Sequence, residues 1–172
     1  MGTYACSIRA GETKKVPMNP ETIENLARAG LSVTHPDPAA NSSCRPVFIS
    51  KIAAGFPSPA DDYVERRLDL NQHCIHHPEA TFFLRVSGDS MTGACIYDND
   101  IMVVDRSLKA VHGKIVVAIL DGEFTVKRLS KEEGVGSHPA LLSENIDYPR
   151  IDIHDGQELE IWGVATFVIH AL

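Results

Sequence analysis

The fold is decided by residues 114–129, which read KIVVAILDGEFTVKRL. Two runs rich in β-branched and aromatic side chains, 114–120 and 123–129, flank the pair Asp121-Gly122. Asp-Gly between two such runs is the strongest short-range signal for a β-hairpin, because both central residues of the favoured turn need a positive φ. The stretch therefore predicts two antiparallel strands joined by a two-residue turn.

Further short strands are expected on both sides of this hairpin. Apolar runs bounded by turn-forming residues occur at 81–86, 101–104, 159–161 and 164–169, and the last two are hinged at Gly163. No internal repeat or low-complexity tract is present. We predict a mainly β fold, with a compact, largely antiparallel and strongly bent sheet or partial barrel.

The first 54 residues differ from the rest of the chain. Prolines at positions 17, 20, 36, 38 and 46 and the polar run 37–43 interrupt them, so most of this segment is expected to be extended or mobile. One short helix is predicted between the N-cap Asn19 and the stop at Gly30. A proline-rich joint, GFPSP at 55–59, follows. The predicted division is an N-terminal arm, 1–54, and a body, 55–172.

The composition narrows the class of protein. Residues 1–54 hold six of the 16 Lys/Arg and four of the 23 Asp/Glu, so the body carries ten basic against nineteen acidic residues. Such a body is a poor candidate for gripping a phosphate backbone. The sequence offers neither a membrane span nor a signal peptide, so we expect a cytoplasmic protein. The scattered cysteines predict free thiols and no cofactor or metal site: Cys6, Cys44, Cys74 and Cys95.

A candidate nucleophile stands in Ser87-Gly88-Asp89-Ser90-Met91, where a predicted strand ends in a tight turn. A serine on such a turn is exposed, and neighbouring backbone N–H groups can converge on a developing oxyanion. The same pattern is more often only a turn. It lacks the second glycine of the Gly-x-Ser-x-Gly elbow, which argues against an α/β-hydrolase.

A candidate base is Lys127, in the second strand of the predicted hairpin. An exposed lysine on a strand normally only contacts water and has no catalytic role. If Lys127 instead faces the interior, desolvation lowers its pKa, and the neutral amine can remove the proton of Ser90. The residues alone leave both interpretations open.

Six blocks, in order, resemble the LexA/UmuD family of self-cleaving serine-lysine peptidases (S24 type), and its UmuD branch most closely. They are AGFPSP (54–59), DYVE (62–65), DLNQ (69–72), SGDSM (87–91), VVD (103–105) and DGEFTVK (121–127). The resemblance runs from about residue 54 to 172 and implies the LexA/signal-peptidase-like fold. It departs from the UmuD branch in having alanine for cysteine at position 54 and a longer arm.

By this resemblance Ser90 is the nucleophile, Lys127 is the general base, and the backbone amides of Ser90 and Asp89 hold the oxyanion. The bond to be cut is Ala54-Gly55, a LexA-like pair. Small residues on both sides of it suit close approach of the serine oxygen to the carbonyl carbon.

The resemblance also implies a place in the SOS response to DNA damage. A RecA filament on single-stranded DNA would stimulate cleavage, and residues 55–172 would form a homodimer that joins a UmuC-like error-prone polymerase in translesion synthesis. Three alternatives stay open: a LexA-like self-cleaving transcriptional repressor, a noncatalytic assembly module, and a peptidase that cuts other proteins.

Other residues have simpler explanations. His73, Cys74, His76 and His77 are close in sequence, but neighbouring positions alternate in direction and rarely converge on zinc. The resemblance gives His112 no role in a Ser-His-Asp triad. Trp162 is expected in core or dimer packing.

Overall fold

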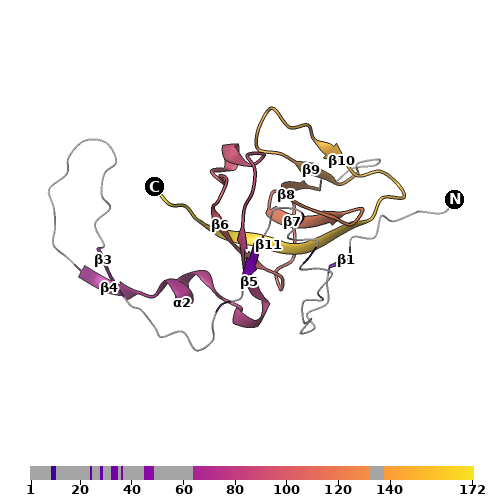
Figure 1. Ribbon diagram of the computed structural model, residues 1–172. Coiled ribbons are helices and arrows are strands. Elements are labelled where there is room, and N and C mark those ends of the chain that lie inside the picture. Colours follow the sequence, from indigo (N-terminus) through magenta and orange to yellow (C-terminus); the bar gives the residue numbers. More distant parts are fainter. Residues whose placement is uncertain are drawn as a thin grey trace. The chain divides into compact units, whose positions relative to one another are not determined.

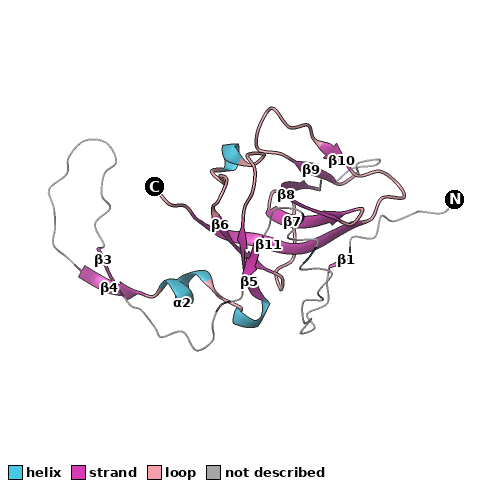
Figure 2. Cartoon of the chain, in the orientation of Figure 1, coloured by secondary structure: helices cyan, strands magenta, loops and turns pink. Residues whose placement is uncertain are grey.

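The computed structural model describes residues 9–10, 24, 28, 32–34, 36, 45–48, 64–131 and 138–172. The chain divides into two compact units. One contains Met1–Pro36 together with His77–Leu172, and the other contains Asp37–His76. Figure 1 traces the described strands and helices along the chain. Strands dominate the described residues, and helices are few and short (Figure 2). The prediction of a mainly β fold is confirmed.

Nine strands of the first unit form one open sheet in the order β10-β9-β8-β7-β11-β6-β5-β2, with β1 paired to β11 beside this path. Neighbours are antiparallel except for β1 and β11, which run parallel. The sheet is bent but not closed into a barrel. Its strands are β1 (Arg9–Ala10), β2 (Ser32–Thr34), β5 (Thr81–Arg85), β6 (Ile101–Asp105), β7 (Ile115–Leu120), β8 (Glu123–Ser130), β9 (Ala140–Leu142), β10 (Ile151–Asp152) and β11 (Leu159–Ile169).

The predicted hairpin is confirmed. β7 and β8 pair without interruption from Ile115 opposite Arg128 to Leu120 opposite Glu123. The turn residues Asp121 and Gly122 have φ values of 50° and 87°. Positive φ at both positions matches the right-handed twist of the flanking strands, which explains why Asp-Gly marks this site.

β11 joins the two halves of the sheet. The two strands expected on either side of Gly163 are one strand, with a register shift against β7 between Ile161 and Gly163. Its first part pairs with β7 and its second part with β6. A Cβ atom at Gly163 would lie 2.5 Å from Val104 Cγ1, so this close approach requires glycine.

Two apolar clusters form the core. The first includes Leu84, Met102, Val126 and Trp162, and the second includes Leu129 and other buried aliphatic residues of β7, β9 and β11. The Trp162 ring lies 5.1 Å from that of Phe82, edge to face. The expected packing role of Trp162 in the core is confirmed. Alternate residues of β7 belong to different clusters, Val117 to the first and Val116 and Ala118 to the second, so the two clusters lie on opposite faces of this strand.

The second unit contains an antiparallel pair, β3 (Arg45–Phe48) and β4 (Val64–Leu68), followed by the helix α2 (Leu70–Cys74). The N-cap Asp69 accepts a hydrogen bond of 2.9 Å from the Asn71 amide. Two 3₁₀ helices, η1 (Pro78–Ala80) and η2 (Thr92–Ala94), lie in the first unit.

The predicted arm is described only in part. Glu24 and Arg28 are helical, and Arg28 Nη2 donates a 2.8 Å hydrogen bond to Glu24 Oε1. The rest of the helix predicted between Asn19 and Gly30 lies outside the described residues. The boundary between 54 and 55 also lies outside them and stays a prediction. In the described part of the chain, no helix is both long and apolar enough to span a bilayer.

Candidate active site

Ser90 stands in a turn that follows β5. The Val86 amide donates to the Asp100 carbonyl and the Asn99 amide to the Val86 carbonyl, both at 2.9 Å, which closes the loop between β5 and β6. Gly88 has a φ of 91°, a left-handed conformation that glycine adopts without strain, and its amide donates to Asp98 Oδ1 at 2.9 Å. The turn therefore has a fixed shape and leaves Ser90 half-buried.

Lys127 lies on β8 opposite Val116. Its side chain points inward, and the residue is only 7% exposed. Nζ donates hydrogen bonds to Ser90 Oγ at 2.8 Å and to the Val126 carbonyl at 3.1 Å. The buried orientation, which the sequence left open, is the one the protein adopts.

Burial lowers the pKa of Lys127, because a charged ammonium is poorly solvated in this setting. No carboxylate among the described residues forms an ion pair with it. A neutral amine at the same 2.8 Å separation has a lone pair that can accept the hydroxyl proton of Ser90. The geometry therefore suits a serine activated by a lysine base.

A small pocket of ≈ 90 Å³ opens beside Ser90. It is lined by residues 86–88, 90 and 91 of the turn and by the β8 residues Phe124, Thr125 and Val126. β9 pairs with only the last part of β8, from Arg128 onward. In the described chain, the β8 residues that line the pocket have β7 on one side and no strand on the other.

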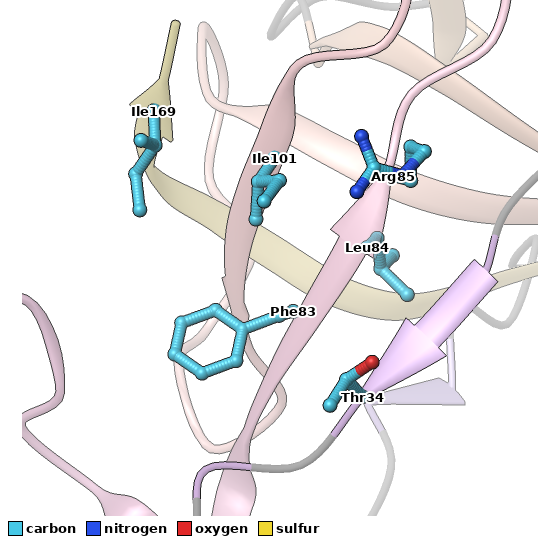
Figure 3. Close-up of a pocket in the computed structure, with 6 residues that line it drawn as sticks. All are labelled: Thr34, Phe83, Leu84, Arg85, Ile101 and Ile169. Atoms are coloured by element: carbon cyan, nitrogen blue, oxygen red, sulfur yellow. The ribbon is translucent and has the colours of Figure 1, made fainter. Parts of the chain in front are cut away.

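A larger pocket of ≈ 270 Å³ lies elsewhere, on β5 and β6 (Figure 3). Its polar side chains are Thr34 and Arg85, and the rest of its wall is apolar. Serine and cysteine are absent from its lining. The guanidinium of Arg85 stays protonated, so it cannot act as a base toward the Thr34 hydroxyl. The larger cavity thus carries no comparable chemistry.

The predicted site also includes the two oxyanion amides and the bond to be cut. No described residue accepts a hydrogen bond from the amide of Asp89 or Ser90. The bond Ala54-Gly55 lies outside the described residues.

The remaining candidates are engaged elsewhere. His112 Nδ1 accepts a hydrogen bond of 3.0 Å from the Lys131 amide, and His77 Nδ1 lies 2.6 Å from Asp105 Oδ2. Among the described residues no three His, Cys, Asp or Glu side chains are grouped to hold a metal ion. Cys74 and Cys95 are free thiols, as expected, and the other two cysteines are not described.

No sequence motif pointed to the loop 143–150 as part of the site. Glu144, Asn145 and Tyr148 all bond to the turn that carries Ser90. Their partners are more than fifty residues away in sequence. No local pattern encodes such contacts.

A model of the family described as peptidase S24-like matches residues 46–166, which include both Ser90 and Lys127. The chain belongs to the peptidase S24-like family. The resemblance to LexA and UmuD that the sequence blocks indicate is thereby confirmed.

Individual members of the S24-like family support the assignment. Protein MucA of Salmonella typhimurium is 50% identical over 122 residues, which cover 70% of this chain and 81% of MucA. Protein ImpA of Escherichia coli is 49% identical over 135 residues, covering 78% of this chain and 90% of ImpA. The LexA repressor of Acidovorax sp. (strain JS42) is 33% identical over 161 residues, covering 93% of this chain and 70% of the repressor.

Proposed function

We propose that this S24-like protein is a serine endopeptidase that cuts its own chain, with Ser90 as nucleophile and Lys127 as general base. The observation that carries the proposal is the 2.8 Å contact between Ser90 Oγ and the buried Lys127 Nζ. Membership of a peptidase family supports it independently.

The first half of the reaction transfers an acyl group to the enzyme. Neutral Lys127 takes the Ser90 proton as Oγ attacks the scissile carbonyl, and the oxyanion that forms is held by the backbone amides of Ser90 and Asp89. The C–N bond then breaks, and the Lys127 ammonium gives its proton to the departing amine. An ester between the acyl fragment and Ser90 remains.

Water completes the reaction. Lys127, neutral again, accepts a proton from a water molecule that attacks the ester carbonyl. The second tetrahedral intermediate collapses, Ser90 Oγ recovers a proton from Lys127, and the new carboxylate leaves. One peptide bond and one water molecule are consumed in each cycle.

The substrate we propose is the Ala54-Gly55 bond of the same chain. The arm 1–54 would be removed and the body 55–172 would be the product. Because arm and body are covalently tethered, the effective concentration of this substrate is high and a deep binding cleft is unnecessary. The small pocket beside Ser90 suits the short side chains at this bond.

We propose further that cleavage belongs to the SOS response in the cytoplasm. A RecA filament on single-stranded DNA would raise the population of the conformation that cuts, without supplying catalytic groups. The product would act as a homodimer bound to a UmuC-like error-prone polymerase. The similarity to MucA and ImpA supports this role over others in the family, and the acidic body suits contacts with protein better than with DNA.

The test is to incubate the purified protein from neutral to alkaline pH beside Ser90→Ala and Lys127→Ala variants, measuring fragment masses over time at several concentrations. We expect one cut between Ala54 and Gly55 that accelerates with pH, is absent from both variants and has a rate independent of concentration. A cut that persists in Ser90→Ala would exclude Ser90 as the nucleophile. No cut in any sample, even with a RecA filament, would favour a noncatalytic assembly module.

A LexA-like repressor is the second candidate, because the LexA repressor match covers 93% of this chain. A gel-shift assay with uncut protein at low salt distinguishes the two. Sequence-selective binding of duplex DNA would support the repressor.

A further inference from the structure

The loop that follows β9 is bonded to the turn that carries Ser90. The Glu144 amide donates to the Ser90 carbonyl at 2.9 Å, and the Gly93 amide donates to the Glu144 carbonyl at 2.6 Å. Asn145 Nδ2 donates to the Asp89 carbonyl at 3.0 Å, and the Tyr148 hydroxyl donates to the Asp89 carboxylate. Two segments far apart in sequence are thus fixed to one another beside the proposed nucleophile.

The hydrogen bond from Asn145 contacts the peptide group whose N–H is proposed to hold the oxyanion. The Asp89 carbonyl and the Ser90 N–H belong to a single planar peptide unit. A donor fixed on the carbonyl oxygen therefore also fixes the direction in which the Ser90 N–H points. The same hydrogen bond polarises the peptide and makes its N–H a stronger donor. No described residue uses that N–H.

The side chain of Asn145 is itself held in the orientation needed to donate to the Asp89 carbonyl. Its Oδ1 accepts a hydrogen bond of 3.0 Å from the Asp147 amide. With the side-chain oxygen engaged there, the amide nitrogen is directed at the Asp89 carbonyl. Both hydrogen bonds are exposed to solvent, so the direction of Nδ2 depends on the anchoring of Oδ1 by the Asp147 amide.

We infer that Asn145 is a positioning residue that aims and polarises the Ser90 amide for the oxyanion, an inference that rests on the proposed self-cleavage. The other contacts of the loop act elsewhere. Glu144 holds the next peptide unit, whose N–H belongs to Met91, and Tyr148 holds the side chain of Asp89. Among the side chains of the loop, only Asn145 contacts the peptide unit that contains the Ser90 N–H. Within the turn itself, the Thr92 amide donates a longer hydrogen bond of 3.3 Å to the same carbonyl.

The experiment measures self-cleavage of the full chain as a function of pH in Asn145→Leu, with Asn145→Asp as a second variant. Both lack the donor: leucine has similar size and no charge, while aspartate keeps the oxygen that accepts from the Asp147 amide. We expect the plateau rate to fall at least tenfold in both, up to the ~100–1000-fold typical of losing an oxyanion donor outright. The pH midpoint of Asn145→Leu should equal that of the wild type, because Lys127 is unaffected.

Two controls use the same loop. Ile146→Ala changes the neighbouring residue, which is 99% exposed, and should cut at the wild-type rate. Tyr148→Phe removes the other side-chain contact to Asp89 and should retain most activity. A thermal melt of each variant confirms folding, and Asn145→Asp replaces Asn145→Leu if the latter does not fold.

The outcomes separate this inference from the proposed function. Four results would each overturn the role of Asn145 and leave self-cleavage intact. Two concern the rate: Asn145→Leu cuts at the wild-type rate, or only Asn145→Asp is slowed. The other two are a shifted pH midpoint in Asn145→Leu and an equal loss of rate in Tyr148→Phe. Absence of cleavage in the wild type under every condition would instead remove the proposed function.

Discussion

Replacing Lys127 with methionine separates the catalytic role of this residue from its structural cost. Methionine has a similar length and no charge, so it can occupy the buried space of a side chain that is 7% exposed. The proposed general base is lost, and such groups contribute about 100–10,000-fold in rate. We therefore expect self-cleavage to slow by at least about a hundredfold, a rise of roughly 3 kcal/mol or more in the activation free energy.

The same substitution should not reduce stability at neutral pH. The variant loses two hydrogen bonds, to Ser90 Oγ and the Val126 carbonyl, each worth about 0.5–1.5 kcal/mol. It also removes the cost of holding an ammonium away from water, which is the reason the pKa of Lys127 is lowered. These effects oppose one another, so the variant should melt close to the temperature of the wild type near pH 6.

The lowered pKa of Lys127 also determines how the free energy of unfolding changes with pH. Since the pKa of Lys127 is lower in the folded than in the unfolded chain, the unfolded chain binds more protons between the two values. The free energy of unfolding of the wild type therefore gains a contribution that increases with pH across that window and is complete near 10.5, the ordinary lysine value. Lys127→Met lacks this contribution, so any stability advantage shrinks as pH rises.

Two measurements test the reasoning: the rate of fragment formation by mass spectrometry, and urea denaturation from pH 6 to pH 10 on a Ser90→Ala background. That background is expected not to cut, and in it Lys127→Met loses only the hydrogen bond to the Val126 carbonyl. Cleavage within tenfold of the wild-type rate would show that Lys127 is not the base. A variant that is less stable at pH 6, with a deficit that does not grow toward pH 10, would refute the claim that burial of the charge is costly.

Three further predictions concern the fold. Gly163→Ala should lower the free energy of unfolding by about 1–3 kcal/mol in urea denaturation, because the new Cβ would lie 2.5 Å from the fully buried Val104; an unchanged value would contradict the close approach. Leu84→Ala should cost about 2–5 kcal/mol in the same assay, since Leu84 is 0% exposed, and a loss below 1 kcal/mol would mean that the cavity collapses. Burial would raise the pKa of Asp100, but hydrogen bonds from a backbone amide and from His170 hold it below its usual value. Asp100 thus stabilises the fold above its unfolded pKa and this contribution is lost as pH falls through the folded value, so Asp100→Asn should lose less stability than the wild type in an acid titration.

The strands that the sequence predicted are those with strong local signals. The Asp-Gly turn and its flanking runs located β7 and β8, and the runs at 81–86 and 101–104 located β5 and β6. The division of β11 at Gly163 was wrong, because glycine there permits close contact with Val104 and leaves the strand continuous. The strands β9 and β10, with three and two residues, were not predicted, since pairing within the sheet rather than local propensity defines them.

The residues of the candidate site also fall into those that the sequence could predict and those that it could not. Ser90 and Lys127 were found from residue type and family resemblance, and the direction of Lys127 could not be decided before its burial was known. Asn145 was missed because its contact with Asp89 spans 56 positions and depends on how β9 and the following loop lie against the turn. The proposed nucleophile and base thus stand in recognisable sequence motifs, whereas the proposed positioning residue is defined by tertiary structure alone.

The place of β11 in the sheet has a mechanical consequence for the proposed dyad. Ser90 follows β5 on one side of β11, and Lys127 lies on β8 on the other side. In the described part of the sheet the two halves are joined through β11, which pairs with β7 and with β6. A strand in this position acts as a clamp, so the proposed chemistry would require β11 to be paired on both of its edges.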